Sequence, residues 1–181
     1  MDLLQNPFYI LNASPRDNRR RIVELADERS LLFDSSECMG ACSELTNPRK
    51  RLSAEVAWLP GIGPKRVGEV LSLLEFSPMD LLVVDKLSSI ARANLLAAGL
   101  ERLHDHSADD VAKWILEIAW TFEGVDPGEL GMIINEDRIV SGFPEVLDTS
   151  VVEAEIQERR RYYCQVIKST KIGRASCRER V

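Results

Sequence analysis

The sequence is poor in aromatic residues, lacks long apolar runs and carries fewer basic than acidic residues. Aromatic side chains make up 6% of the 181 residues, and 23 basic residues stand against 29 acidic ones. A membrane-spanning helix needs about 20 consecutive apolar residues. No stretch approaches that length, so we expect no membrane span. The acidic balance is not typical of proteins that bind nucleic acid through charge alone.

Cysteine and histidine are also too few and too scattered for a convincing metal site. Cys38 and Cys42 lie four residues apart, and only His104 and His106 could join them. That spacing differs from the pairs typical of zinc sites, so we interpret the two cysteines as small core residues. Phosphate-binding glycine loops, nucleophile elbows and metalloprotease motifs are missing as well. We therefore predict no catalytic residue, no metal site and no cofactor.

The two ends of the chain give further expectations. The start, MDLLQNPF, has neither the positive segment nor the apolar core of a secretion signal, which favours a cytoplasmic protein. Residues 172–181, IGRASCRERV, resemble the translation of a sequencing adapter. We interpret residues 171–181 as an artefactual tail and expect the natural protein to continue differently after residue 170.

Helix-start signals recur along the chain and predict an all-α fold. A capping residue precedes proline at Ser14, Asn47, Ser77 and Asp126, and no sustained alternation indicates a strand. The predicted helices cover residues 7–11, 15–33, 36–45, 48–59, 64–74, 78–85, 87–103, 108–122, 127–141 and 150–169. In the second of them, Ile22, Leu25, Ala26 and Leu32 form the expected apolar face.

Three segments of the first third of the chain share a pattern with a known family. They are NPFYILN at residues 6–12, SPRDNRRRIVELADERSLL at 14–32, and CSELTNPRKRLSAE at 42–55. Together they resemble a J-domain, which implies a helical hairpin followed by a further helix. That family engages a heat-shock chaperone through a His-Pro-Asp loop, but LLFDSSECM occupies the corresponding residues 31–39. The resemblance therefore predicts a J-like packing or docking unit that does not stimulate a chaperone ATPase.

The next segment, LPGIGPKRVGEVL at residues 59–71, resembles a helix-hairpin-helix motif. The resemblance implies that Gly61, Ile62 and Gly63 form a hairpin whose N–H groups face a DNA phosphate, with Lys65 and Arg66 adding charge. The alternative interpretation is a simple turn between two helices. Val67 stands where the family prefers alanine, and the chain has no second copy of the motif.

These observations predict a J-like helical region ending in a helical hairpin at residues 1–76 and a multi-helix bundle at 77–170. Our leading hypothesis is a protein–protein interaction module, an adaptor or scaffold, and the alternative is a DNA-binding protein. The candidate partner-binding residues are basic or aromatic positions on the second and last helices, Arg19, Arg20, Arg159, Arg160 and Tyr163. A basic surface around an exposed hairpin would favour DNA, whereas a solvated helix face is the ordinary alternative for each cluster. The sequence does not define the oligomeric state.

Overall fold

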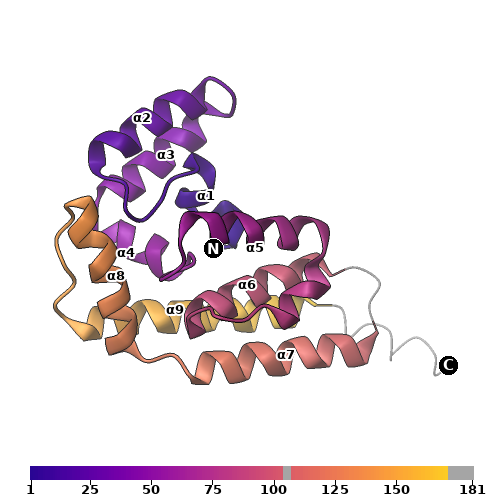
Figure 1. Cartoon of the computed structure of the whole chain (residues 1–181). Coiled ribbons are helices and arrows are strands. Elements are labelled where there is room, and N and C mark those ends of the chain that lie inside the picture. Colours follow the sequence, from indigo (N-terminus) through magenta and orange to yellow (C-terminus); the bar gives the residue numbers. More distant parts are fainter. Residues whose placement is uncertain (104–106, 171–181) are drawn as a thin grey trace.

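A computed structural model of the chain describes residues 1–103 and 107–170, and these residues form helices joined by short connections (Figure 1). No strand occurs in these two ranges, which confirms the predicted all-α class. The predicted tail, residues 171–181, lies outside the described residues, as do His104 and His106.

The N-terminal part comprises a 3₁₀ turn and four helices. Their bounds are Leu3–Gln5 (η1), Pro7–Leu11 (α1), Arg19–Ser30 (α2), Ser35–Thr46 (α3) and Pro48–Val56 (α4). Helices α2 and α3 pack side by side and stand out from the rest of the molecule, at the top of Figure 1. The J-like character of this region stays a prediction, because helix order alone does not identify a family.

Helix α2 begins and ends inside the predicted range. Its N-cap is Asn18, whose Oδ1 accepts a hydrogen bond from the N–H of Arg21 at 2.9 Å, rather than Ser14. Asp17 instead accepts a hydrogen bond from the N–H of Ser14, so these residues form a turn before the helix. The helix ends at Ser30, so the expectation that Leu32 belongs to its apolar face is wrong.

The remaining helices form the lower part of the molecule in Figure 1. Their bounds are Pro64–Phe76 (α5), Pro78–Val83 (η2, a 3₁₀ helix), Ser89–Arg102 (α6), Ala108–Glu123 (α7), Pro127–Ser141 (α8) and Thr149–Ser169 (α9). Helix α6 lies at the centre of this part, in contact with α5, α7 and α9. The absence of a side chain at Gly99 allows the close approach of α6 and α7, because a Cβ there would lie 2.6 Å from Trp114.

The main hydrophobic cluster includes residues from both predicted regions. It extends from Leu3 in η1 through Trp58, after α4, to Val166 in α9. A smaller cluster joins α4 to α8 and α9 through Leu52, Ile134 and other apolar residues. Apolar side chains from both sides of residue 76 therefore pack into the same cluster. The domain boundary at residue 76 stays a prediction.

Candidate functional site

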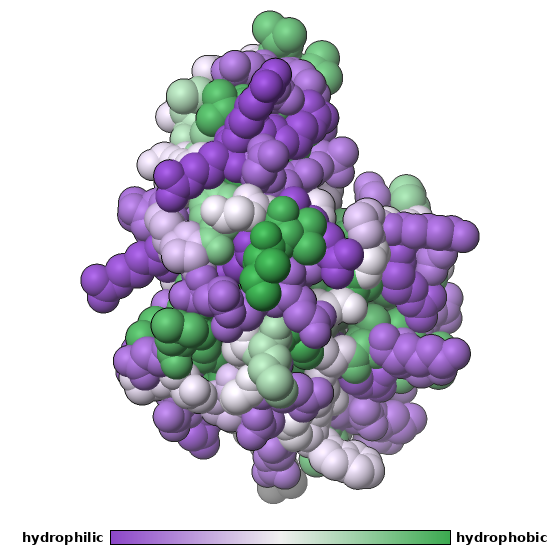
Figure 2. Space-filling model, turned by 60° about the vertical axis from the view of Figure 1, so that its left-hand side comes forward, coloured by the Kyte–Doolittle hydropathy of each residue, from purple (hydrophilic) through white to green (hydrophobic). Residues whose placement is uncertain are grey.

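The connection between α2 and α3 exposes several large apolar side chains to solvent. Leu31, Leu32 and Phe33 follow the last turn of α2 and are 85%, 77% and 53% exposed. Asp34 then starts α3 by accepting a hydrogen bond from the N–H of Glu37 at 2.9 Å. Figure 2 shows apolar side chains at the top end of the molecule, where Figure 1 places this connection. We call Leu31, Leu32 and Phe33 the apolar tip.

Acidic side chains surround the apolar tip. Asp27 and Glu28 lie one helical turn before Leu31 and Leu32, and both are exposed. Asp34 and Glu37, on the other side of the tip, are exposed as well. The nearest cation in the sequence is Arg29, whose guanidinium lies 4.1 Å from the centre of the Phe33 ring. The tip is therefore an apolar surface with a predominantly negative rim.

The predicted contact residues Arg19 and Arg20 lie at the other end of α2. A helix of 12 residues is about 18 Å long, so these arginines are well separated from the apolar tip. Both are exposed. Arg20 pairs with Glu24 at 2.9 Å, and the Arg19 guanidinium lies 5.3 Å from the centre of the Phe143 ring. Their charges are thus partly engaged within the chain.

The glycine hairpin between α4 and α5 lies on the surface. Gly61, Gly63 and Lys65 are exposed, and Ile62 is partly buried against the core. Gly61 has a φ of 78°, a conformation that disfavours other residues. Arg66 pairs with Glu69 at 3.0 Å and lies 3.9 Å from Asp85, so carboxylates offset its charge. Of the predicted phosphate contacts, only Lys65 is a cation without an ion pair among the described residues.

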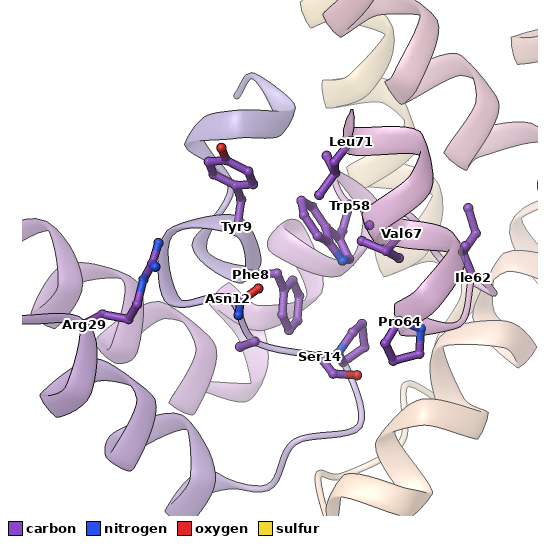
Figure 3. A pocket seen from close by; sticks show the side chains of 13 residues that line it. Phe8, Tyr9, Asn12, Ser14, Arg29, Trp58, Ile62, Pro64, Val67 and Leu71 are labelled. Atoms are coloured by element: carbon purple, nitrogen blue, oxygen red, sulfur yellow. The ribbon is translucent and has the colours of Figure 1, made fainter. Parts of the chain in front are cut away.

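A groove runs between α1 and the N-terminal half of α5, with a volume of about 420 Å³ (Figure 3). Its apolar lining comes from side chains of α1, α5 and the segment between α4 and α5, namely Phe8, Trp58, Ile62, Pro64, Val67 and Leu71. Tyr9, Asn12, Ser14 and Arg29 add polar groups, and none of the described carboxylates lines the groove. We call it the α1–α5 groove. It brings Ile62 next to residues 8–15 of the opening segment.

The predicted cluster on the last helix is divided between the interior and the surface. Arg160 is exposed, whereas Arg159 and Tyr163 are buried. Arg159 Nε donates to Asn94 Oδ1 at 2.8 Å, and the Tyr163 hydroxyl donates to the same oxygen at 2.6 Å. The interpretation of Arg159 and Tyr163 as members of a surface cluster is therefore wrong, because both side chains fix α9 against α6.

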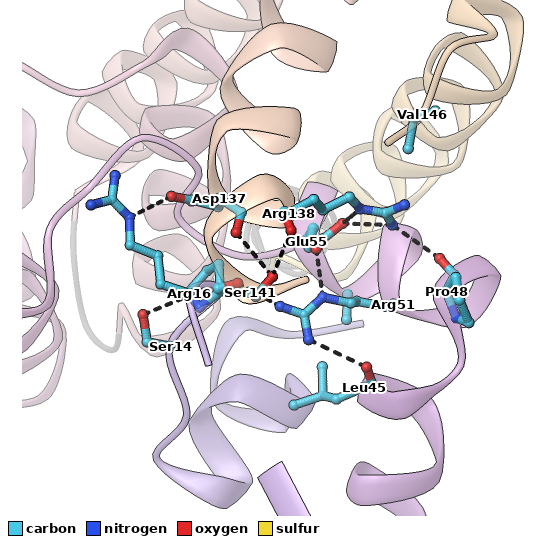
Figure 4. Close-up of polar contacts among 12 residues, drawn as sticks. Ser14, Arg16, Leu45, Pro48, Arg51, Glu55, Asp137, Arg138, Ser141 and Val146 are labelled. Carbon is cyan, nitrogen blue, oxygen red and sulfur yellow. Dashed lines mark hydrogen bonds and ion pairs between the residues drawn. The ribbon is translucent and has the colours of Figure 1, made fainter. Parts of the chain in front are cut away.

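A second buried polar network joins α4 to α8 (Figure 4). Glu55 accepts hydrogen bonds from Arg51 Nε at 2.7 Å and from Arg138 Nε at 2.9 Å. Burial lowers the pKa of the Arg51 guanidinium and raises the pKa of the Glu55 carboxyl, and the opposite charges act against both shifts. Arg51 therefore lies in the interior and cannot contribute to a basic surface around the hairpin.

The described residues contain no group of three or more His, Cys, Asp or Glu side chains that could hold a metal ion. Cys38 and Cys42 are buried, as the sequence predicts for core residues. No described helix combines the length and the apolar character that a membrane crossing requires.

Comparisons with known proteins give no family for this chain. No family model matches it, and neither the curated proteins nor the solved structures contain a significant match.

Proposed function

We propose that the chain is a protein–protein interaction module, an adaptor or scaffold, that binds a partner through its apolar tip. The exposure of Leu31, Leu32 and Phe33 is the observation that carries the proposal. Large apolar side chains that lie together on a surface are typical of interaction sites. Burial of each such side chain contributes about 1.5–3 kcal/mol, so the three together can support a specific complex.

The acidic rim defines the partner's chemistry. Asp27, Glu28, Asp34 and Glu37 favour a partner whose apolar contact surface is bordered by lysine or arginine. The same carboxylates disfavour an anionic membrane surface or a second copy of the tip, because like charges would face one another. A J-like unit of this kind docks a partner without the His-Pro-Asp loop and is not expected to stimulate a chaperone ATPase.

The proposal can be tested by site-specific photo-crosslinking followed by binding measurements. A photoreactive residue at position 32 should give discrete adducts in cells, whereas one at the exposed position Glu153 on α9 serves as the control. Each captured protein is then purified and its affinity measured by calorimetry. We expect Leu31→Ser combined with Leu32→Ser to weaken binding at least 30-fold without changing stability. An unchanged affinity in this folded variant, or the absence of position-specific adducts, would exclude the tip as the interface.

DNA binding through the hairpin is the second candidate, and the exposure of Gly61, Gly63 and Lys65 favours it. Against it stand the buried Arg51 and the ion-paired Arg66. Fluorescence anisotropy with labelled single- and double-stranded DNA across a salt series tests this candidate. Binding that weakens steeply with salt and is lost in Lys65→Gln would establish a phosphate contact and make the tip secondary. No binding at low salt would leave the hairpin as a turn.

A further inference from the structure

The α1–α5 groove contains a hydrogen-bond donor without a partner among the described residues. Trp58 is only 3% exposed, and its ring packs beside Phe8 with the centroids 6.1 Å apart. Its indole N–H donates to no described residue, and Figure 3 shows the nitrogen on the side of the ring that faces Val67. Unlike the Trp114 nitrogen, which is fully buried and has no partner in the described part of the chain, the Trp58 nitrogen is open to the groove. An acceptor that enters the groove can therefore accept a hydrogen bond from it.

Arg29 is the one charged side chain among the described residues that line the α1–α5 groove itself. No described carboxylate pairs with this guanidinium, which stacks on Phe33 and donates through Nε to the carbonyl oxygen of Ile10. Helix α5 starts at the groove with Pro64, has no acidic residue in its first turn and carries Lys65 next in sequence. The positive end of the helix dipole and these cations favour an anionic group. The Asn12 side chain adds a further donor at the rim.

Gly68 keeps the groove open. It lies inside α5, where glycine is about 1 kcal/mol less favourable than alanine. A Cβ at this position would meet no atom within 4 Å, so neither packing nor backbone conformation requires glycine here. Its missing side chain instead enlarges the space between α1 and α5.

The groove continues into a second hollow along α5. This neighbouring hollow has a volume of about 520 Å³ and shares Tyr9, Gly68 and Leu71 with the α1–α5 groove. It ends near Glu75 and Arg102. A continuous, elongated depression suits an extended chain better than a compact small molecule, because a compact ligand would occupy only one of the two hollows.

From these features we infer that the α1–α5 groove binds an extended peptide segment of a partner protein, in which a large apolar side chain lies next to a carboxylate. The apolar side chain packs against Val67, Leu71 and the edge of Trp58. The carboxylate or a peptide carbonyl accepts from the Trp58 N–H, and Arg29 provides the complementary charge. This inference goes beyond the proposed function, since the apolar tip selects a basic partner surface and the groove an acidic segment.

Nuclear magnetic resonance of the tryptophan indole groups tests the inference directly. The chain has three tryptophans, and the variants Trp58→Phe and Trp120→Phe assign their ¹⁵N–¹H signals. The probes are a terminally blocked peptide, acetyl-Glu-Leu-Phe-Asp-Leu-amide, and its counterpart in which Gln and Asn replace the two acids. We expect the acidic peptide to shift the Trp58 signal selectively and to bind at least five-fold more tightly than the neutral one.

A matched pair of glycine variants separates groove binding from general effects. Gly68→Leu fills the groove, whereas Gly40→Leu places the same side chain inside α3, where a Cβ also meets no atom within 4 Å. Binding should be lost in Gly68→Leu and retained in Gly40→Leu, with circular dichroism confirming that both are folded. Equal binding of the two peptides, unchanged binding in Gly68→Leu, or no shift of Trp58 at millimolar peptide would each overturn the inference. None of these results bears on the tip, which is tested separately through Leu31 and Leu32.

Discussion

The buried carboxylate of Glu55 should be one of the most important single side chains for stability. It lies between two guanidinium groups, with Arg51 Nε at 2.7 Å and Arg138 Nη2 at 2.8 Å. All three side chains are almost fully buried, and Arg138 comes from a helix 83 positions later in the sequence. Glu55→Ala would therefore leave two cations in the interior without a counter-charge.

The expected magnitude follows from that geometry. Removing one partner of a buried ion pair costs about 3–5 kcal/mol, because the remaining charge stays desolvated. Domains of this kind have a total stability of about 5–15 kcal/mol, so the loss is a large share of it. With a urea m-value of about 2 kcal/mol/M, the unfolding midpoint should fall by about 2 M. Asp137→Ala is the matched control, since its partner Arg16 is mostly exposed and such pairs contribute about 1 kcal/mol or less.

Urea unfolding followed by circular dichroism measures both variants. Glu55→Ala combined with Arg138→Met should be less destabilised than the sum of the single changes, because the second substitution removes one of the stranded cations. If Glu55→Ala loses no more stability than Asp137→Ala, the network is open to water and the reasoning from burial fails.

Three further predictions concern packing, pH and helix capping. Gly99→Ala should lower stability by about 1–3 kcal/mol because its Cβ would overlap Trp114, whereas Gly40→Ala should raise it by about 0.5–1 kcal/mol; thermal unfolding compares the two. Burial and the hydrogen bond to a glutamate raise the pKa of Tyr162. The unfolded state therefore loses the Tyr162 proton at a lower pH than the folded state does. Stability should be retained below about pH 10 and lost as the pH rises further, and the loss should be less steep in Tyr162→Phe. Urea unfolding midpoints measured across this pH range test the prediction. Asn47→Ala should cost about 1 kcal/mol, since Asn47 caps α4 through two backbone N–H groups, and urea unfolding measures it.

Local signals in the sequence were sufficient to predict most helices. Asn47-Pro48 and Asp126-Pro127 start α4 and α8 as predicted, because a cap and a proline act within a single turn. Ser14-Pro15 failed because Asn18, four residues later, offers a competing cap. Whether Ser14 or Asn18 starts the helix depends on how the segment packs on the rest of the chain, and adjacent residues contain no such information.

The buried charges could be predicted only in part. Arg159 lies at the same helical spacing as the buried residues Val152, Ile156, Tyr163 and Val166. Helical periodicity, applied without excluding charged residues, would therefore have predicted that Arg159 faces the core. Hydropathy alone assigns it to the surface. Its acceptor, Asn94, is 65 positions away, and no local signal connects the two residues.

The glycines show which feature of the hairpin motif needs an explanation beyond folding. Gly61 is accounted for by its positive φ and by Ile133, which would lie 3.3 Å from an added Cβ. Gly68 has no such constraint and weakens a helix that alanine would favour. Gly40 in α3 is equally unconstrained, but of the two only Gly68 lines the α1–α5 groove, so Gly68 is the glycine for which a binding role should be sought. The motif's resemblance directs attention to Gly61 and phosphate, but the geometry directs it to Gly68 and the α1–α5 groove.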